Sequence, residues 1–284
     1  MFNDLRYAFR QLLKNPGFTA VAVLTLALGI GVNVAVFSMA NAVLWRPLNF
    51  PEPNQLVQLG EGDRLNGNRG GVSASNFRDW AEHSRSFSQI AAMRTTALNL
   101  GGVGNPERLV GAEISEDYFG VLRVEPQLGR FLAKEDFPSG DHVALISHRL
   151  WIRRFGAVTN ILGKAIRLNG EPHTVVGVVP ECLAALQENV DLWTPVLITP
   201  EQLLNRENQP YALCARLRPR VSVEQARAEM KAIAGRLAAD FPSLYSRLEI
   251  WIAPLGERFS TSAACVIPAI KAAQTNPVEA LRYE

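Results

Sequence analysis

The chain begins with a long run of apolar positions that carries no charge. No residue from Asn15 to Trp45 is charged, and Phe18 to Met39 reads FTAVAVLTLALGIGVNVAVFSM. A helix needs about 20 mostly apolar residues to cross the hydrocarbon core of a bilayer. Asn15 and Pro16 suit the N-cap and the first turn of such a helix. The pattern therefore predicts a transmembrane helix over residues 16–45.

The residues before this run alternate between apolar and basic positions at helical spacing. Arg6, Arg10 and Lys14 recur every fourth residue on one face, and apolar residues occupy another. This pattern predicts an amphipathic helix over residues 1–15 that lies in the headgroup layer. Its excess of basic residues places this end in the cytoplasm, so residues from about 46 onward are expected outside.

Two details of the apolar run concern its processing and its neighbours. Ala40-Asn41-Ala42 resembles a signal-peptide cleavage site, but the apolar region exceeds the usual 7–15 residues, which favours an uncleaved anchor. Ala27, Gly31 and Ala35 stand four apart, a spacing that lets a second helix approach closely. Whether that contact forms stays open from the sequence alone.

Strand and helix patterns alternate from about residue 46 to residue 256. Asn169-Gly170 lies between two β-rich runs and predicts a hairpin. Ser75 is expected to cap a short helix, and Ser222 with Gln225 forms a capping box before a helix whose apolar positions step by 3 and 4. Further strands are expected at His142–Ile146, Tyr211–Leu217 and Leu248–Ile252. Short helices interleaved with hairpins predict an α+β domain over 46–256, large enough for two lobes.

Charge and motifs exclude several function classes. The 284 residues include 29 basic and 27 acidic side chains, so no basic field indicates a nucleic-acid partner. Gly163-Lys164 lacks the glycine spacing and the following hydroxyl of a phosphate-binding loop, and it is expected to form a turn rather than to bind ATP. No nucleophile, general base or cofactor motif is present. We therefore predict no enzymatic activity, no cofactor, and no catalytic, cofactor-binding or metal-binding residue.

Histidine and cysteine positions support the same conclusion. His83, His142, His148 and His173 lack a ligand spacing to one another or to cysteine, so surface or capping roles are expected. Cys182 and Cys214 could form a disulfide in an oxidising compartment, and the sequence leaves this open. The arginine-rich turn at residues 149–154 is expected to be a solvated helix face.

Several sequence segments, taken together and in order, resemble segments of the MacB/FtsX-like ABC transporter permeases. The resemblance is strongest to the large orphan permeases of that group. The apolar run with its basic flank resembles their first transmembrane helix. Residues 46–256 resemble the MacB-like periplasmic core domain through RPLNFPEPNQLVQL, SASNFRDW, ERLVGAEISEDYFGVLRVEPQLGRFL, WIRRFG, ILGKAIRLNGEPHTVVGVVP and DLWTPV.

The resemblance implies a membrane subunit that is not an enzyme. It implies a separate cytoplasmic ABC ATPase as partner, contacts with other permease subunits through the transmembrane helix, and membrane lipid around that helix. The location would be the cell inner membrane, with the N-terminus in the cytoplasm and the main domain periplasmic. The function would be export or the handling of lipids and lipoproteins, and no site residue is carried over from the family.

Residues 257–284 also resemble these permeases, because IPAIKAAQTNPVEALRYE is similar to the cytoplasmic tail after their last membrane helix. Ser262 to Ile270 is too short for a second span. The expected form is therefore a permease-type subunit with an internal deletion. The alternative is a single-pass extracytoplasmic binding or scaffolding module that associates with intact permeases. A hydrolase released after Ala42 fits worst, because no nucleophile arrangement is present.

Overall fold

The computed structural model describes residues 16–44, 50–65, 67, 69–102, 105–137, 142–185 and 189–256. The chain divides into two compact units, one that includes helix α2 (Pro16–Leu44) and one that spans residues 48–257. The amphipathic helix expected over residues 1–15 and the permease-like tail expected over 257–284 lie outside the described residues.

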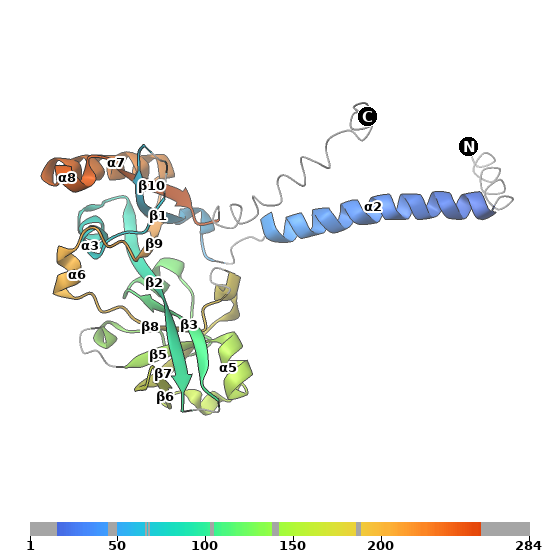
Figure 1. Ribbon diagram of the computed structural model, residues 1–284, viewed down its shortest axis with the longest axis horizontal. Coiled ribbons are helices and arrows are strands. Elements are labelled where there is room, and N and C mark those ends of the chain that lie inside the picture. The colour runs from blue at the N-terminus through green and yellow to red at the C-terminus, as the bar shows by residue number, and fades with distance from the viewer. Residues whose placement is uncertain are drawn as a thin grey trace. The chain divides into compact units, whose positions relative to one another are not determined.

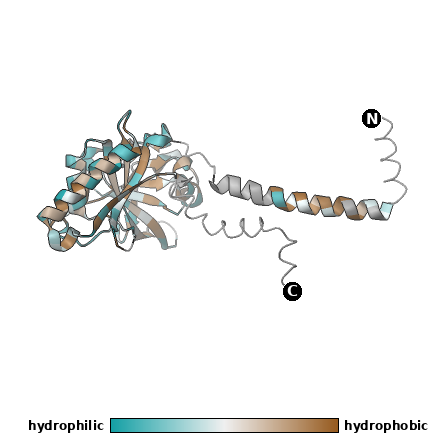
Figure 2. Ribbon diagram, turned by 90° about the horizontal axis from the view of Figure 1, so that it is seen from above, coloured by the Kyte–Doolittle hydropathy of each residue, from teal (hydrophilic) through white to brown (hydrophobic). Residues whose placement is uncertain are grey.

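Helix α2 is 29 residues long and bonds its polar side chains to its own backbone. Thr25 Oγ1 donates to the Val21 carbonyl at 2.8 Å, and Asn33 Nδ2 donates to the Gly29 carbonyl at 2.8 Å. The large apolar side chains from Val21 to Val34 are 57–66% exposed, and Figure 2 colours them as hydrophobic.

Among the side chains that can be described, none of the helices combines the length and the apolar character that crossing a membrane requires.

The second unit is built on one ten-stranded sheet with the strand order β10-β1-β9-β2-β3-β8-β5-β7-β4, while β6 pairs with β2 and β7. The strands are β1 (Leu56–Asp63), β2 (Phe87–Gly101), β3 (Glu107–Ile114), β4 (Leu128–Gly129), β5 (Val143–Ser147), β6 (Ala165–Leu168), β7 (Glu171–Val179), β8 (Leu192–Pro195), β9 (Ala212–Leu217) and β10 (Leu248–Pro254). The helices are α3 (Ala74–His83), α4 (Tyr118–Leu122), α5 (His148–Phe155), α6 (Pro200–Leu204), α7 (Val223–Asp240) and α8 (Pro242–Tyr245), with short turns η1 (Pro53–Gln55), η2 (Lys134–Asp136), η3 (Thr159–Ile161) and η4 (Glu181–Ala185).

Strand β2 belongs to two lobes of this unit (Figure 1). Its first half pairs with β9, its second half pairs with β3, and its last two residues pair with β6. We call β10, β1, β9 and the first half of β2 the first lobe, together with α3, α6, α7 and α8. The second lobe holds the remaining strands and α5. Its pairings run from β2 through β3, β8, β5, β7 and β6 back to β2, so this part of the sheet closes into a ring.

The mixture of helices with one large mixed sheet confirms the α+β class, and each lobe has its own apolar core. The first core packs α7 on the sheet with Ala226, Met230, Ile233 and Leu237 buried, as the 3-and-4 spacing predicts. The second core fills the ring with Leu100, Leu109, Ala144, Ile146, Leu150, Ile161, Ile166, Leu168, Val175, Val178 and Leu192. Burying side chains of this kind contributes about 1.5–3 kcal/mol each.

Most of the turns and helix caps that the sequence predicts are present in the structure. Asn169 and Gly170 both have positive φ, at 51° and 93°, as the turn between β6 and β7 requires. The capping box at Ser222 forms, because Gln225 N donates to Ser222 Oγ and Ser222 N donates to Gln225 Oε1. The cap expected at Ser75 is wrong. Ser73 caps α3, while Ser75 is buried and donates to the Leu203 carbonyl at 2.5 Å.

We expect residues 48–256 to fold cooperatively when produced alone, because both cores and all the described strand pairings lie within them. Thermal unfolding followed by near- and far-UV circular dichroism should give a single coincident transition. A compact product that lacks near-UV signal would contradict this prediction.

Candidate functional site

Gly163 and Lys164 form the turn that leads into β6, as expected from the sequence. Gly163 has φ +76°, its N–H donates to the Val175 carbonyl at 2.9 Å, and Lys164 Nζ donates to Asn160 Oδ1 at 3.1 Å. A phosphate-binding loop opens a helix so that the backbone N–H groups of the first turn face the phosphate. A strand follows this turn instead, so it does not form such a cradle.

The two described cysteines are not joined. Neither Cys182 nor Cys214 forms a disulfide. Cys214 is buried on β9, whereas Cys182 is half-buried in η4, where burial raises the pKa of its thiol above the ordinary value. Cys265 lies outside the described residues.

The structure brings two of the four histidines together, which the sequence did not predict. The rings of His142 and His173 have their centroids 4.8 Å apart. Burial lowers the pKa of His173, and the neighbouring His142 lowers it further. His83 and His148 instead contact the Asp79 carbonyl and the Gln127 side chain. In the part of the chain that is described, no group of three or more His, Cys, Asp or Glu side chains is placed to hold a metal ion.

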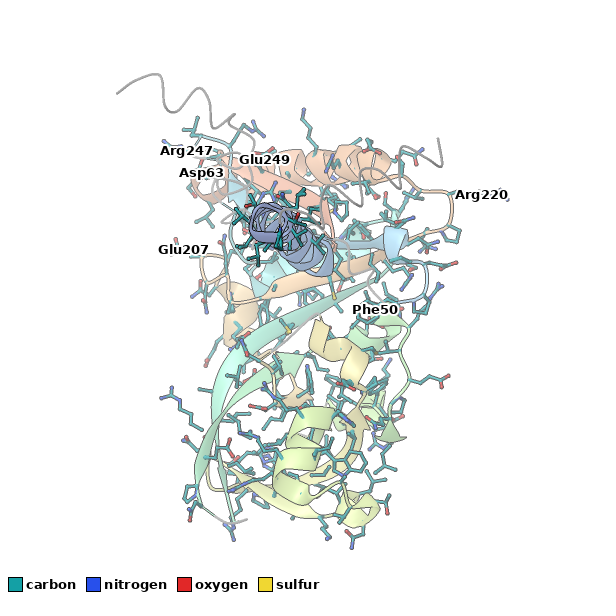
Figure 3. The ribbon with its side chains drawn as sticks, turned by 90° about the vertical axis from the view of Figure 1, so that its right-hand side faces the viewer. Phe50, Asp63, Glu207, Arg220, Arg247 and Glu249 are labelled. Atoms are coloured by element: carbon teal, nitrogen blue, oxygen red, sulfur yellow. The ribbon has the colours of Figure 1, made fainter. Side chains whose placement is uncertain are left out.

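A polar cleft of about 630 Å³ lies at one end of the first lobe. The end of β1, the segment before β9 and the turn between α8 and β10 surround it. Figure 3 shows Asp63, Arg247 and Glu249 at one corner of this lobe and Glu207 on a neighbouring loop. The residues that line it include Glu61, Asp63, Arg69, Arg206, Gln209, Tyr245 and Arg247.

Glu61 is the buried carboxylate of this cleft, with only 2% of its surface exposed. Its Oε1 accepts hydrogen bonds from Ser73 N at 3.1 Å and Asn76 Nδ2 at 2.8 Å, and its Oε2 accepts one from Gln209 Nε2 at 2.7 Å. Burial raises the pKa of Glu61, and these hydrogen bonds offset part of the rise. Both carboxylate oxygens are occupied by protein donors, so Glu61 holds the cleft in shape rather than acting as a base.

Asn76 on α3 is the centre of the hydrogen-bond network around Glu61. Its Oδ1 accepts from Arg206 Nη1 at 2.6 Å and from the Tyr245 hydroxyl at 3.1 Å. Arg206 also pairs with Asp79 at 2.9 Å, and its guanidinium lies 4.6 Å from the centre of the Phe241 ring. The network therefore joins β1, α3, α8 and the segment before β9. Charged and amide side chains therefore dominate the lining of the cleft.

A second hollow of about 400 Å³ lies beside α5 in the second lobe. Ile152, Leu183, Val190 and Trp193 contribute apolar surface to it. Arg149 and Arg153 also line it, and both face Asp191, with N–O distances of 2.9 Å and 3.8 Å.

The two ends of the second unit meet at the first lobe. Val57 pairs with Pro254, and Leu255 N donates to the Leu56 carbonyl at 2.9 Å. Arg216, which is 1% exposed, lies beside this point and donates through Nε to the Val121 carbonyl at 2.8 Å. Burial lowers the pKa of Arg216.

Glu52 ties the entry of the second unit to its body. It pairs with Arg123 at 2.5 Å and lies 3.7 Å from Arg216 Nη1. Glu52 has φ +50°, a left-handed conformation that side-chain contacts of this kind must hold.

The comparisons with known proteins give one family model and several similar folds. The sequence profile of the MacB-like periplasmic core domain matches residues 19–233. No curated protein matches the chain in sequence. The periplasmic region of MacB from Actinobacillus actinomycetemcomitans is 16% identical with a TM-score of 0.57, and the match covers 78% of this chain and 98% of that chain.

Two further solved structures have similar folds. A domain from Porphyromonas gingivalis, described as belonging to a permease protein, is 19% identical with a TM-score of 0.54 and covers 72% of this chain and 92% of its own. The extracellular domain of the noncanonic ABC-type transporter YknZ from Gram-positive bacteria is 18% identical with a TM-score of 0.51. That match covers 69% of this chain and 99% of that chain. At these identities the likeness concerns the fold alone.

Replacing Glu61 by alanine should destabilise the domain by about 3 kcal/mol, because three buried donors and Arg206 lose their acceptor or counter-charge. The exposed Glu249 on the neighbouring strand β10 is the matched control, and Glu249→Ala should change the free energy of unfolding by less than about 0.5 kcal/mol. Urea unfolding of both variants measures the difference. Equal midpoints would show that the network around Glu61 does not stabilise the fold.

Proposed function

Because the chain belongs to the MacB-like periplasmic core domain family, we propose that it is a membrane-anchored permease-type subunit of an ABC transporter. Residues 50–256 act outside the inner membrane in this proposal, and the transporter exports substrates or handles lipids and lipoproteins. Besides the family, one observation supports this proposal most. The two ends of the domain lie side by side, because Leu255 is hydrogen-bonded to Leu56. A domain that lies between two membrane helices, as in the intact permeases that this chain resembles, needs its ends close together, and we propose that this chain is an internally deleted form of such a permease.

The apolar surface of α2 supports the membrane anchor. Its described large side chains are exposed on all sides of the helix, and a helix that is hydrophobic all round is normally covered by lipid or by other helices. The described side chains of α2 do not qualify as a span, so a span over residues 16–45 rests on the charge-free sequence and on the family. The basic residues before it support a cytoplasmic N-terminus.

Permeases of this family work with ABC ATPases, and we propose a separate cytoplasmic ATPase as the partner of this chain. The chain itself is proposed not to be an enzyme. The turn at Gly163 and Lys164 supports this, because it leads into a strand and offers no phosphate cradle.

A single-pass binding or scaffolding module is the second candidate. It is favoured by the spacing of Ala27, Gly31 and Ala35 on α2, and an added Cβ at Gly31 would have no neighbour within 4 Å. Another helix could approach closely there. The module would then associate with intact permease subunits and would not carry the ATPase itself.

The topology can be tested with introduced cysteines. We expect Glu201→Cys, at an exposed position on α6, to react with a membrane-impermeant maleimide in right-side-out vesicles. Cys182 and Cys265 are replaced by serine in this background, and Asn3→Cys is the control that should react only after lysis. Reaction of Glu201→Cys only after lysis would reverse the proposed orientation.

Co-purification of an ATPase with the chain separates the two proposed roles. The purified chain should not bind ATP, with or without Lys164→Ala, whereas the chain isolated gently from its native membrane should retain an ATPase. Recovery of permease subunits without an ATPase would favour the scaffolding module. If the purified chain binds ATP and Lys164→Ala abolishes that binding, the turn is a phosphate site, and both proposed functions, which assume a chain without ATP binding, are contradicted.

A further inference from the structure

His142 and His173 lie side by side at one end of the ring of strands in the second lobe. His142 directly precedes β5, and His173 is in β7. These two strands are parallel, and Val143 is the partner of Thr174. The Thr174 N–H donates to the His142 carbonyl at 2.6 Å, which extends the pairing to the residue that carries the first ring.

Oxygen atoms of Glu171 lie near the Nδ1 atom of both histidine rings. His173 Nδ1 lies 3.2 Å from the Glu171 carbonyl oxygen, and His142 Nδ1 lies 3.8 Å from Glu171 Oε2. A carbonyl oxygen accepts hydrogen bonds and does not donate them, so the 3.2 Å contact assigns the proton of the neutral His173 ring to Nδ1 and leaves its Nε2 lone pair available. The Glu171 carboxylate lies at ion-pair distance from His142 Nδ1 and favours a proton on that nitrogen, which leaves Nε2 of His142 as the metal-binding atom. Histidines that bind metals commonly have this arrangement, with the second nitrogen donating to a carboxylate or a carbonyl.

The spacing of the rings fits two ligands of one ion. A Zn–N bond of 2.0–2.1 Å places the centre of each imidazole about 3.2 Å from the ion. Two rings bound at the tetrahedral angle would have their centres about 5.2 Å apart, and two bound at a right angle about 4.5 Å apart. The observed separation of 4.8 Å, with the ring planes at 62°, lies between these values.

We propose that His142 and His173 bind a divalent first-row transition-metal ion through their Nε2 atoms, with Glu171 orienting both rings. Imidazole nitrogen suits Zn²⁺, Ni²⁺ and Cu²⁺, whereas Ca²⁺ and Mg²⁺ prefer oxygen ligands. Water completes the coordination shell, because the described residues supply no third protein ligand. The site is therefore exchangeable, unlike a closed structural zinc site, and the ion links β5 to β7 across the end of the ring.

His142 and Glu171 are open to solvent and His173 is half-buried, so an ion can reach the site and variants should fold. The side chain of His142 is 51% exposed and that of Glu171 is 67% exposed. His83 in the first lobe is a matched control, because its Nδ1 also contacts a backbone carbonyl, at 2.8 Å, but its ring has no second imidazole beside it among the described residues.

The test is calorimetric titration of the full chain, purified in detergent without a histidine tag, with ZnCl₂ and with CuCl₂. We expect one ion per chain, with Cu²⁺ bound more tightly than Zn²⁺. His142→Ala and His173→Ala should each weaken binding at least tenfold, His83→Ala should leave it unchanged, and Glu171→Gln should weaken it less than either alanine variant. MgCl₂ should not bind.

Thermal unfolding gives an independent readout, because an ion that binds only the folded state raises the unfolding midpoint. Zn²⁺ should raise the unfolding midpoint of the unmodified chain and of His83→Ala. It should not change the unfolding midpoint of the double variant His142→Ala/His173→Ala. His142→Gln and His173→Gln replace the alanine variants if either of those unfolds. Absence of binding, or binding that survives loss of both rings, would overturn the proposal.

Discussion

The two lobes depend on the continuity of one strand, β2. Its residues up to Met93 pair with β9, and its residues from Met93 onward pair with β3, so Met93 faces Ala212 on one side and Ile114 on the other. A break there would leave backbone groups unpaired in both lobes at once, and each unpaired buried group costs about 1–3 kcal/mol. The lobes therefore cannot separate without breaking the sheet. The ion pair between Arg94 and Glu113 lies directly beyond this point and reinforces the pairing of β2 with β3.

The first lobe carries a buried charge at each end of its central strands. Arg216 on β9 is the partner of Leu56 at the start of β1, and Glu61 lies five residues further along β1 at the cleft. At about 3.4 Å per residue, the two ends are about 17 Å apart. Each charge is held by hydrogen bonds to segments distant in sequence, so both ends of β1 are fixed by polar contacts whose loss is costly. Strand β1 therefore connects the entry of the domain with the cleft, and it pairs with β10 over Val57–Asp63 and with β9 over Leu56–Leu59.

The features that were predictable from the sequence are those set by neighbouring residues. The Asn169-Gly170 turn, the capping box at Ser222 and the buried stripe of α7 all follow from spacings of one to four residues. Strand β2 was not predicted, because its burial reflects different partners along its length and shows no single alternation. Glu61 was missed because its acceptor role depends on Asn76 and on Gln209, which is 148 positions away. The pairing of His142 with His173 depends in the same way on the parallel register of β5 and β7, which no local pattern reveals.

The sheet ends differently in the two lobes, and this determines how many hydrogen-bond ladders hold each strand against a pull. The second lobe closes its strands into a ring, so every strand of the ring has two neighbours. In the first lobe, β10 pairs only with β1, and an exposed edge of this kind needs protection. Arg227 on α7 supplies it, because its Nε and Nη2 both donate to the Ile252 carbonyl, at 3.2 Å and 2.9 Å. Strand β10 is also the last strand before the chain leaves the domain. In the proposed permease, a pull on this strand would meet one ladder of hydrogen bonds and the Arg227 contact, whereas a pull on the ring would have to break two ladders. Strand β10 is therefore the strand of the first lobe that the fewest backbone hydrogen bonds hold, and it lies next to the cleft that Glu61 holds in shape.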